Sequence, residues 1–419
     1  MIVLNHAHGL TWILAGLATA GVIARPRRLP EAIWAVLGAI LLVVFGLMPW
    51  REALGAAAKG TDVYLFLVGM MLLAELARRE GLFDTLAALA VHRARGSASG
   101  LFALIYGVGT VVTIFLSNDA TAVVLTPAVY AATRAAKAEP MPYLFICAFI
   151  ANAASFVLPI SNPANLVLFG SHMPPLLTWL GRFALPSILS IATTFLVLRL
   201  ALRGSLRGEL PRDIAVPPMR AGGWLTLYGI GLTAVVLLTA SAFDVQLGLP
   251  TLLAGALTAV GVLAGKREAP WPVLRGVSWS VLPLVAGLFV LVEGLNRTGV
   301  ITALVSLLED WAHRPARLAA VGGVSVAVVT NLMNNLPAGL IAGSTVAQAS
   351  VPDTVTGALL IGVDLGPNLS ITGSLATILW LLALRREGEA VGFWDFLKLG
   401  ALVMPPALLL ALAGLILTA

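Results

Sequence analysis

Long apolar segments, separated by short polar ones, follow one another along the whole of this 419-residue chain. Most are about as long as the roughly 20 residues that a helix needs to cross a bilayer, and they lack the alternation of a strand. The pattern therefore predicts an all-α polytopic membrane protein. The segments fall at 7–24, 29–48, 62–78, 100–136, 142–171, 183–203, 224–242, 249–265, 278–295, 317–350, 354–384 and 396–418, with short amphipathic pieces at 83–94 and 300–312.

Four of these segments carry polar residues in their middle. Segment 100–136 holds Ser117-Asn118-Asp119 and is too long for one crossing. Its length fits either a re-entrant hairpin or two full crossings, because both return the chain to the same side. Polar residues at this depth usually mark a pathway. The other three interruptions lie at Ser161-Asn162-Pro163-Ala164-Asn165, at Asn334-Asn335, and between Asp364 and Thr377.

The second half of the chain repeats the pattern of the first. Residues 67–75 align with 285–293, an offset of 218 between Glu75 and Glu293, and Asn118 aligns with Asn334. Further along, Asn152 aligns with Asp364. Five crossings in each half, an odd number, require the second half to be inverted. Two such halves with interruptions at matching places indicate a secondary transporter whose site lies at the repeat interface. The predicted division is a first repeat at 1–203, a polar cytoplasmic linker at 204–222 and a second repeat at 223–419.

Composition and charge agree with this reading and give the orientation. Hydrophobic residues make up 59% of the chain and charged residues 11%, against about 25% charged in a soluble domain. The mean hydropathy is +0.96. With the N-terminus outside, 20 of the 26 Lys and Arg residues fall on the cytoplasmic side, which accounts for the net charge of +6 without a nucleic-acid partner. The six exceptions are Arg51, Lys59, Arg182, Arg297, Arg314 and Arg317.

Two acids are candidates for coupling transport to a proton or another ion. Asp119 has the most apolar surroundings of any acid here, so it should bind a cation, pair with a base or take up a proton. Asp364 lies inside the last interrupted segment. Each acid also has a structural alternative: Asp119 as the cap of the half-helix that starts at Ala120, and Asp364 as a partner of unwound backbone near Gly366.

Hydroxyl and amide side chains at the four breaks are the candidate substrate ligands, because amides both donate and accept hydrogen bonds. The alternative is that these side chains only satisfy backbone groups freed by the broken helices. The candidates are Ser117, Asn118, Ser161, Asn162, Asn165, Asn334, Asn335, Ser374 and Thr377.

Two symmetric acids and the prolines of the linker predict structure rather than chemistry. Glu75 and Glu293 lie near span ends, each with arginines three or four residues on, a spacing at which helical side chains pair. The arginines are Arg78 and Arg79 for the first acid and Arg297 for the second. The linker carries Pro211, Pro217 and Pro218.

Other features exclude whole classes of site. The single cysteine, Cys147, rules out an internal disulfide or a multi-thiolate centre and fits a small core residue. His6 and His8 lack a third ligand, so no metal is expected. No Gly-x-x-x-x-Gly-Lys-Ser/Thr loop occurs, so the chain hydrolyses no nucleotide by that route. We expect a transporter without a cofactor, not an enzyme.

Four motifs resemble those of the arsenite efflux permeases of the ArsB type, and the resemblance covers nearly the whole chain. They lie at 116–127, 160–165, 331–337 and 373–380. The Asn-Asp and Asn-Asn-x-Pro pair is the more specific part. One departure is Pro163, where an aliphatic or β-branched residue is expected.

The resemblance places the chain in the ion transporter superfamily, with dicarboxylate/sodium symporters and plant silicon exporters. It implies two inverted-topology repeats, each with a re-entrant helical hairpin (100–136 and 317–350) and a discontinuous transmembrane helix (142–171 and 354–384). It also implies a multi-pass protein of the cytoplasmic (inner) membrane. The implied activity is export of arsenite and antimonite driven by protons, in some members with a soluble companion ATPase.

The residues at the breaks fit this chemistry. Arsenite near neutral pH is an uncharged trihydroxide, which needs donors and acceptors rather than a cationic clamp. No arginine or lysine falls near the breaks in sequence, which argues against a dicarboxylate. One repeat bundle would then rock or slide against the other. The alternatives are an ion-coupled carrier of silicic acid, a carboxylate or sodium, and a channel or membrane enzyme.

Overall fold

The computed structural model describes residues 6–170, 173–211, 216 and 218–419. In these residues the chain is helical apart from turns and one isolated bridge between Ser97 and Glu209. The first half contains α1 (His6–Ala24), η1 (Pro26–Arg28), α2 (Glu31–Val44), α3 (Trp50–Ala58), α4 (Thr61–Arg79), α5 (Leu82–Arg93), α6 (Ala98–Phe115), α7 (Asn118–Ala120), η2 (Thr121–Leu125), α8 (Thr126–Ala135), α9 (Met141–Ala153), η3 (Pro159–Ser161), α10 (Pro163–Phe169) and α11 (Leu176–Ala201).

The second half follows the same order. Within the described residues, seven helices are long and apolar enough to cross a membrane, or up to nine if each bent pair counts as one span. The prediction of an all-α polytopic protein is confirmed. The helices are α12 (Ala221–Ala242), α13 (Gly248–Lys266), α14 (Trp271–Gly276), α15 (Val281–Arg297), α16 (Val300–Trp311), α17 (Pro315–Met333), α18 (Asn335–Val346), α19 (Asp353–Leu365), η4 (Gly366–Leu369), α20 (Leu375–Arg386) and α21 (Phe393–Leu417).

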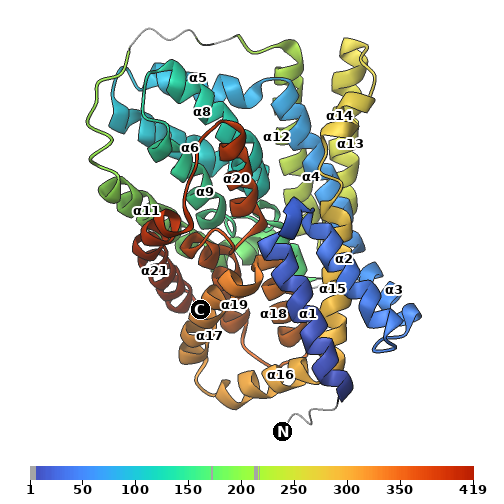
Figure 1. Ribbon diagram of the computed structural model, residues 1–419. Helices are drawn as coiled ribbons and strands as arrows, with labels where there is room; N and C mark the ends of the chain where they lie inside the picture. The colour runs from blue at the N-terminus through green and yellow to red at the C-terminus, as the bar shows by residue number, and fades with distance from the viewer. Residues whose placement is uncertain (1–5, 171–172, 212–215, 217) are drawn as a thin grey trace.

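The helices form two bundles, and each bundle takes helices from both halves (Figure 1). The framework bundle consists of α1–α4 and α12–α15, in which α4 packs on α13 and α15 packs on α2. The site bundle consists of α6–α11 and α17–α21, in which α17 packs on α19 and α11 packs on α21. The amphipathic helices α5 and α16 link the two. The expectation that one repeat moves against the other is therefore corrected: any relative motion would be between two bundles of mixed origin.

Two equivalent glycines let the framework helices cross closely. A Cβ atom on Gly69 of α4 would lie 2.3 Å from the carbonyl oxygen of Thr251 in α13. A Cβ atom on Gly287 of α15, which the repeat aligns with Gly69, would lie 2.7 Å from the backbone of Ala35 in α2. Both contacts are to backbone, which cannot rotate away. The same crossing is thus made twice, each time between helices of different halves.

The two hairpins enter from opposite ends of the molecule (Figure 1). The first consists of α6, a turn at Leu116 and Ser117, and then α7, η2 and α8. The second consists of α17 and α18, joined at Asn334 with φ of 76°. Both tips line one small internal cavity, described below, so both hairpins are re-entrant and the reading of two full crossings is excluded. The halves differ in one respect: η2 is a π-helical turn, whereas α18 is regular.

The two discontinuous helices are broken at 154–162 and 366–374. Their second halves, α10 and α20, pack against the hairpin of the opposite repeat, α10 on α18 and α20 on η2. Pro163 is the first residue of α10. A proline fits there because the first helical N–H has no partner within the helix. The departure from the family motif at this position therefore leaves the half-helix intact.

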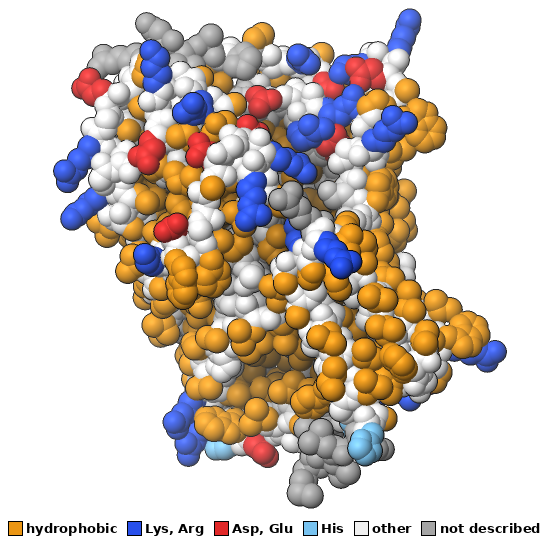
Figure 2. Space-filling view, viewed as in Figure 1, with side chains coloured by type: hydrophobic (Ala, Val, Ile, Leu, Met, Phe, Trp, Pro, Cys, Tyr) orange, Lys and Arg blue, Asp and Glu red, His pale blue; other side chains and the backbone are white. Residues whose placement is uncertain are grey.

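Charged side chains gather at one end of the molecule, above a broad hydrophobic band (Figure 2). An excess of Lys and Arg at one end is what the sequence prediction expects of the cytoplasmic side. Arg212 and Pro217 of the linker lie outside the described residues.

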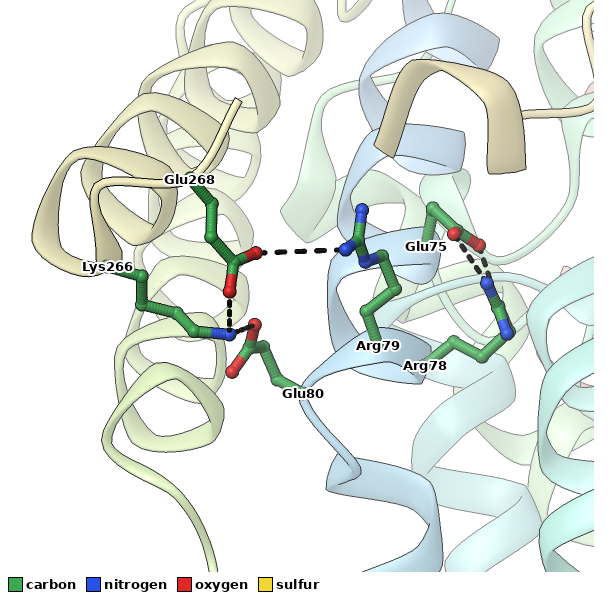
Figure 3. A network of polar contacts seen from close by, with 6 residues as sticks. All are labelled: Glu75, Arg78, Arg79, Glu80, Lys266 and Glu268. Carbon is green, nitrogen blue, oxygen red and sulfur yellow. Dashed lines mark hydrogen bonds and ion pairs between the residues drawn. The ribbon is translucent and has the colours of Figure 1, made fainter. Parts of the chain in front are cut away.

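A polar network at this end ties α4 to α13 (Figure 3). Glu75 pairs with Arg78 as predicted, at 2.6 Å. Arg79 instead reaches Glu268, at 3.7 Å, and Lys266 joins Glu268 to Glu80. The network lies wholly within the framework bundle and its connections.

The predicted partner of Glu293 is wrong. This acid pairs with Lys59, at 2.7 Å, while Arg297 pairs with Glu52. The reason is that α3, which the apolar pattern did not predict, packs on α15 and brings two charged residues beside it. Cys147 is fully buried, as expected of a core residue.

The glycine crossing generates a stability prediction. Replacing Gly69 by valine should lower the melting temperature of the purified protein in detergent, because overpacking against backbone costs about 1–3 kcal/mol or more. The matched control is Gly231→Val in α12, where nothing lies within 4 Å of a new Cβ. Equal melting temperatures for the two variants would contradict the close crossing.

Candidate functional site

Each of the four mid-membrane half-helices begins with a side chain that caps it. Ser117 Oγ accepts from the N–H of Ala120 at 3.3 Å, and Ser374 Oγ accepts from the N–H of Thr377 at 3.1 Å. Asn162 Oδ1 accepts from Ala164 at 3.0 Å, and Asn334 Oδ1 accepts from Leu336 at 3.3 Å. Backbone groups at this depth must find partners inside the protein, and short polar side chains supply them. The cap that was considered for Asp119 is therefore made by Ser117 instead.

The four breaks surround a small inner cavity of about 10 Å³, roughly the space of one water molecule. Four candidate residues line it: Asn118 and Asp119 from the first tip, Asn162 from the first broken helix, and Asn335 from the second hairpin. The other lining residues are apolar and include Val281 and Val285 of the framework bundle. None of the described residues that line this cavity is Lys or Arg.

A larger cavity of about 770 Å³, the vestibule, lies between the two bundles. It extends from Ser117 and Asp119 to exposed arginines at the charged end. Three arginines line it, namely Arg78, Arg275 and Arg386. The absence of cations near the breaks thus holds for the inner cavity but not for the mouth of the vestibule. Arg275 comes from α14, which is far from the breaks in sequence, and Arg386 is the last residue of α20, at the opposite end of that half-helix from the break.

Asp119 lines both cavities and is partly exposed. It follows the cap residue at the start of its half-helix, where the helix dipole favours negative charge. Its carboxyl group is therefore the acid at the junction between the inner cavity and the vestibule.

Asp364 is placed differently. It is fully buried in α19, and Oδ1 accepts a hydrogen bond from Asn162 Nδ2 at 2.8 Å. Its other oxygen, Oδ2, has no partner among the described residues. It lines neither of the two cavities, but Asn162 connects it to the inner one.

A second buried network was not predicted. Asn152 Nδ2 donates to Asn368 Oδ1 at 3.0 Å and to Thr377 Oγ1 at 3.3 Å, and Ser374 Oγ donates to Asn152 Oδ1 at 3.2 Å. The signal for Asn152 was present in its alignment with Asp364, which assigned it no role. Asn331 similarly donates to the carbonyl of Gly366 in the second break.

The candidate ligands divide between the two readings left open by the sequence. Ser161 donates to the carbonyl of Ile114, and Asn165 donates to the carbonyls of Ser155, Leu158 and Pro159. These contacts satisfy broken backbone. Five of the polar residues line a cavity: Ser117, Asn118, Asp119, Asn162 and Asn335. Five others hold the breaks together: Ser161, Asn165, Asn334, Ser374 and Thr377.

Comparisons with known proteins agree with this arrangement. Residues 14–366 match the citrate transporter family, CitMHS. The chain is 29% identical to an arsenical pump membrane protein of Escherichia coli, over 94% of this chain and 95% of that protein. It is 28% identical to an arsenical pump membrane protein of Yersinia enterocolitica, over 83% and 84%. The fold is similar to the crystal structure of the Alcanivorax borkumensis YdaH transporter, with a TM-score of 0.56, 17% identity and coverage of 88% and 86%.

The vestibule generates an accessibility prediction. In a Cys147→Ala background, Val123→Cys should react with a membrane-impermeant thiol reagent applied from the cytoplasmic side, because Val123 lines the vestibule. Val129→Cys, in the same hairpin but fully buried, should stay unreacted. Labelling in inside-out and right-side-out vesicles measures this. Reaction of Val123→Cys only from the outer side would overturn the assignment of the vestibule.

Proposed function

We propose that this chain, which belongs to the citrate transporter family (CitMHS), exports arsenite and antimonite from the cytoplasm in exchange for protons. The chain is a multi-pass membrane transporter of the cytoplasmic (inner) membrane, and relatives that are 28% and 29% identical to it carry the name arsenical pump membrane protein. On this proposal it is a secondary transporter and not an enzyme.

The observation that carries the proposal is the chemistry of the inner cavity. Its polar lining consists of amides and one carboxyl group, without a cation. Oδ1 of Asn118 accepts from Asp119 N–H, and Oδ1 of Asn334 caps α18. The Nδ2 group of Asn118, which lines the cavity, has no partner among the described residues and remains available as a donor. Asn335 Oδ1, buried and without a partner there, is available as an acceptor. A neutral trihydroxide needs this mixture.

A carboxylate such as the citrate of the family description is the second candidate, because three arginines line the vestibule. Arg78 is already paired with Glu75, through two hydrogen bonds of 2.6 and 2.7 Å. Arg275 and Arg386 lie at the exposed mouth, away from the inner cavity. A bound polycarboxylate usually requires cationic partners at the site itself, so the lining of the inner cavity favours the uncharged cargo.

Asp119 is the coupling acid in this proposal. As a carboxylate it accepts a hydrogen bond from a hydroxyl group of the cargo. Protonation of that oxygen removes its negative charge and makes it a hydroxyl donor, which weakens the hydrogen bond from the cargo. Cargo and proton therefore compete for the same oxygen, as exchange requires. Its position at the junction of the two cavities gives it access to cytoplasmic water in this conformation.

The vestibule is the loading route for an exporter. The inner cavity holds about one water molecule, so cargo entry requires the two hairpin tips to separate. Movement of the site bundle against the framework bundle then exposes the site on the other side. In this proposal a soluble companion ATPase would bind at the cytoplasmic end, but the exchange itself requires only protons.

The proposal is tested by arsenite uptake into everted membrane vesicles, with and without an imposed pH gradient. Wild type should accumulate arsenite when the gradient is present. Asp119→Asn should reduce the initial gradient-driven rate by about tenfold or more, because the proton-binding oxygen is lost. Asp84→Asn, which alters an exposed acid near the mouth of the vestibule, should leave the rate unchanged.

The outcomes separate substrate from coupling. Uptake that survives in Asp119→Asn keeps the cargo and removes the coupling role of this acid. No uptake by folded wild type sinks the arsenite proposal and leaves a carboxylate, silicic acid or sodium as the cargo.

A further inference from the structure

The inverted repeat places two equivalent hydrogen bonds between the broken helices. Asn162, the cap of α10, donates to Asp364 of α19 at 2.8 Å. Ser374, the cap of α20, donates to Asn152 of α9 at 3.2 Å. The offset is 212 residues for both members, from Asn162 to Ser374 and from Asn152 to Asp364. In each pair, a cap of one half bonds a side chain of the other half.

The Asn152 pair is complete. Oδ1 of Asn152 accepts from Ser374, and Nδ2 donates to Thr377 Oγ1, one turn along α20 from the cap. The neutral amide thus offers one acceptor and one donor to two residues of the same half-helix, and its Nδ2 also donates to Asn368 Oδ1, at 3.0 Å.

The Asp364 pair lacks the second connection. Oδ1 of Asp364 accepts from Asn162, but Oδ2 has no partner among the described residues. The residue equivalent to Thr377 is Asn165, again at an offset of 212. Its Nδ2 donates to three backbone carbonyls, which fixes the orientation of the amide. Its Oδ1 is buried and has no partner in the described part of the chain either. Two unpartnered acceptors thus lie at the positions where the other pair has a donor and an acceptor.

We infer that Asp364 carries a proton in this conformation, with Oδ1 accepting from Asn162 and the hydroxyl at Oδ2 donating to Oδ1 of Asn165. A neutral carboxylic acid has the same one-acceptor, one-donor pattern as the Asn152 amide. The proton satisfies both unpartnered oxygens at once and makes the two repeats equivalent. Both acceptor residues are on α10, which packs against α19.

The surroundings of Asp364 supply no charge that would hold it ionised. The described hydrogen bonds and ion pairs give it one contact, from the neutral amide of Asn162. An ionised acid with a single neutral donor in the membrane interior is costly. The elements packed against α19 are α9, α10, α17, α18, α21 and η4. Their titratable side chains are Tyr143 and Cys147 on α9, Arg317 at the start of α17, and Asp395 and Lys398 at the start of α21.

The inference assigns different roles to the two acids. Asp364 is a positioning residue that joins α19 to α10 as a neutral acid, sealed from both cavities. Asp119 remains as the acid that exchanges a proton, and in this respect the inference rests on the proposed function. Between them, the two acids then contribute one exchangeable proton to each transport cycle.

The experiment is infrared spectroscopy of the purified full-length protein in detergent, which separates protonated carboxyl groups from carboxylates by their C=O stretching bands. At neutral and mildly alkaline pH, Asp364→Asn should remove one carboxylic-acid band that wild type shows. The matched control is Asp353→Asn at the exposed start of the same helix, which should leave that band in place.

Transport supplies the second readout. Asp364→Asn should change gradient-driven uptake and its pH profile by less than about threefold, because the amide restores both hydrogen bonds. Asp364→Ala should lower the melting temperature, since it leaves Asn162 and Asn165 without their partner. Rescue by the amide and not by alanine distinguishes a positioning acid from a proton carrier.

Two results overturn the inference. An acid band unchanged by Asp364→Asn shows that Asp364 is ionised at neutral pH. Loss of gradient-driven uptake in an Asp364→Asn protein that melts like wild type shows that Asp364 exchanges the proton. If wild type takes up no arsenite, the proposed function fails, while the infrared result still decides the state of Asp364.

Discussion

A peptide group in the middle of a bilayer must find its hydrogen-bond partner within the protein, and the architecture of this chain depends on that constraint. Four half-helices start at mid-membrane depth, and each start is capped by Ser117, Asn162, Asn334 or Ser374. The caps bring hydroxyl and amide groups to one place. The polar centre of the molecule is therefore a direct product of how its helices are broken.

The bundles turn this polar centre into a site with access from one side. Helix crossings at Gly69 and Gly287 hold the framework bundle together with backbone contacts, and the polar network around Lys266 closes its cytoplasmic end. The vestibule lies between this bundle and the hairpin tips. Each bundle contains helices of both halves. The twofold axis that relates the repeats therefore also relates the side of the site that faces one end of the molecule to the side that faces the other end.

The sequence predicted those parts of the structure that depend on local pattern and on the duplication. Apolar length predicted the spans, and the match of Asn118 with Asn334 predicted that two tips meet. It did not predict the partner of Glu293, which comes from Lys59 on a short helix with little apolar signal. It also missed the arginines of the vestibule, because α14 and α20 approach the first hairpin only in the folded chain. Contacts between distant segments leave no periodic trace in one sequence.

The π-helical turn at Thr121–Leu125 has a consequence for the energy balance of the molecule. In a transporter made of two identical inverted halves, a twofold rotation would convert the inward-facing conformation into the outward-facing one, and the two would have equal free energy. The first hairpin, α6 to α8, contains a π turn, with its wider backbone winding, and the second, α17 and α18, does not. The two hairpins therefore differ in backbone structure, and the repeat symmetry that would give the two conformations equal free energy is broken. The repeat symmetry therefore does not by itself make the two conformations of the empty protein equal in free energy.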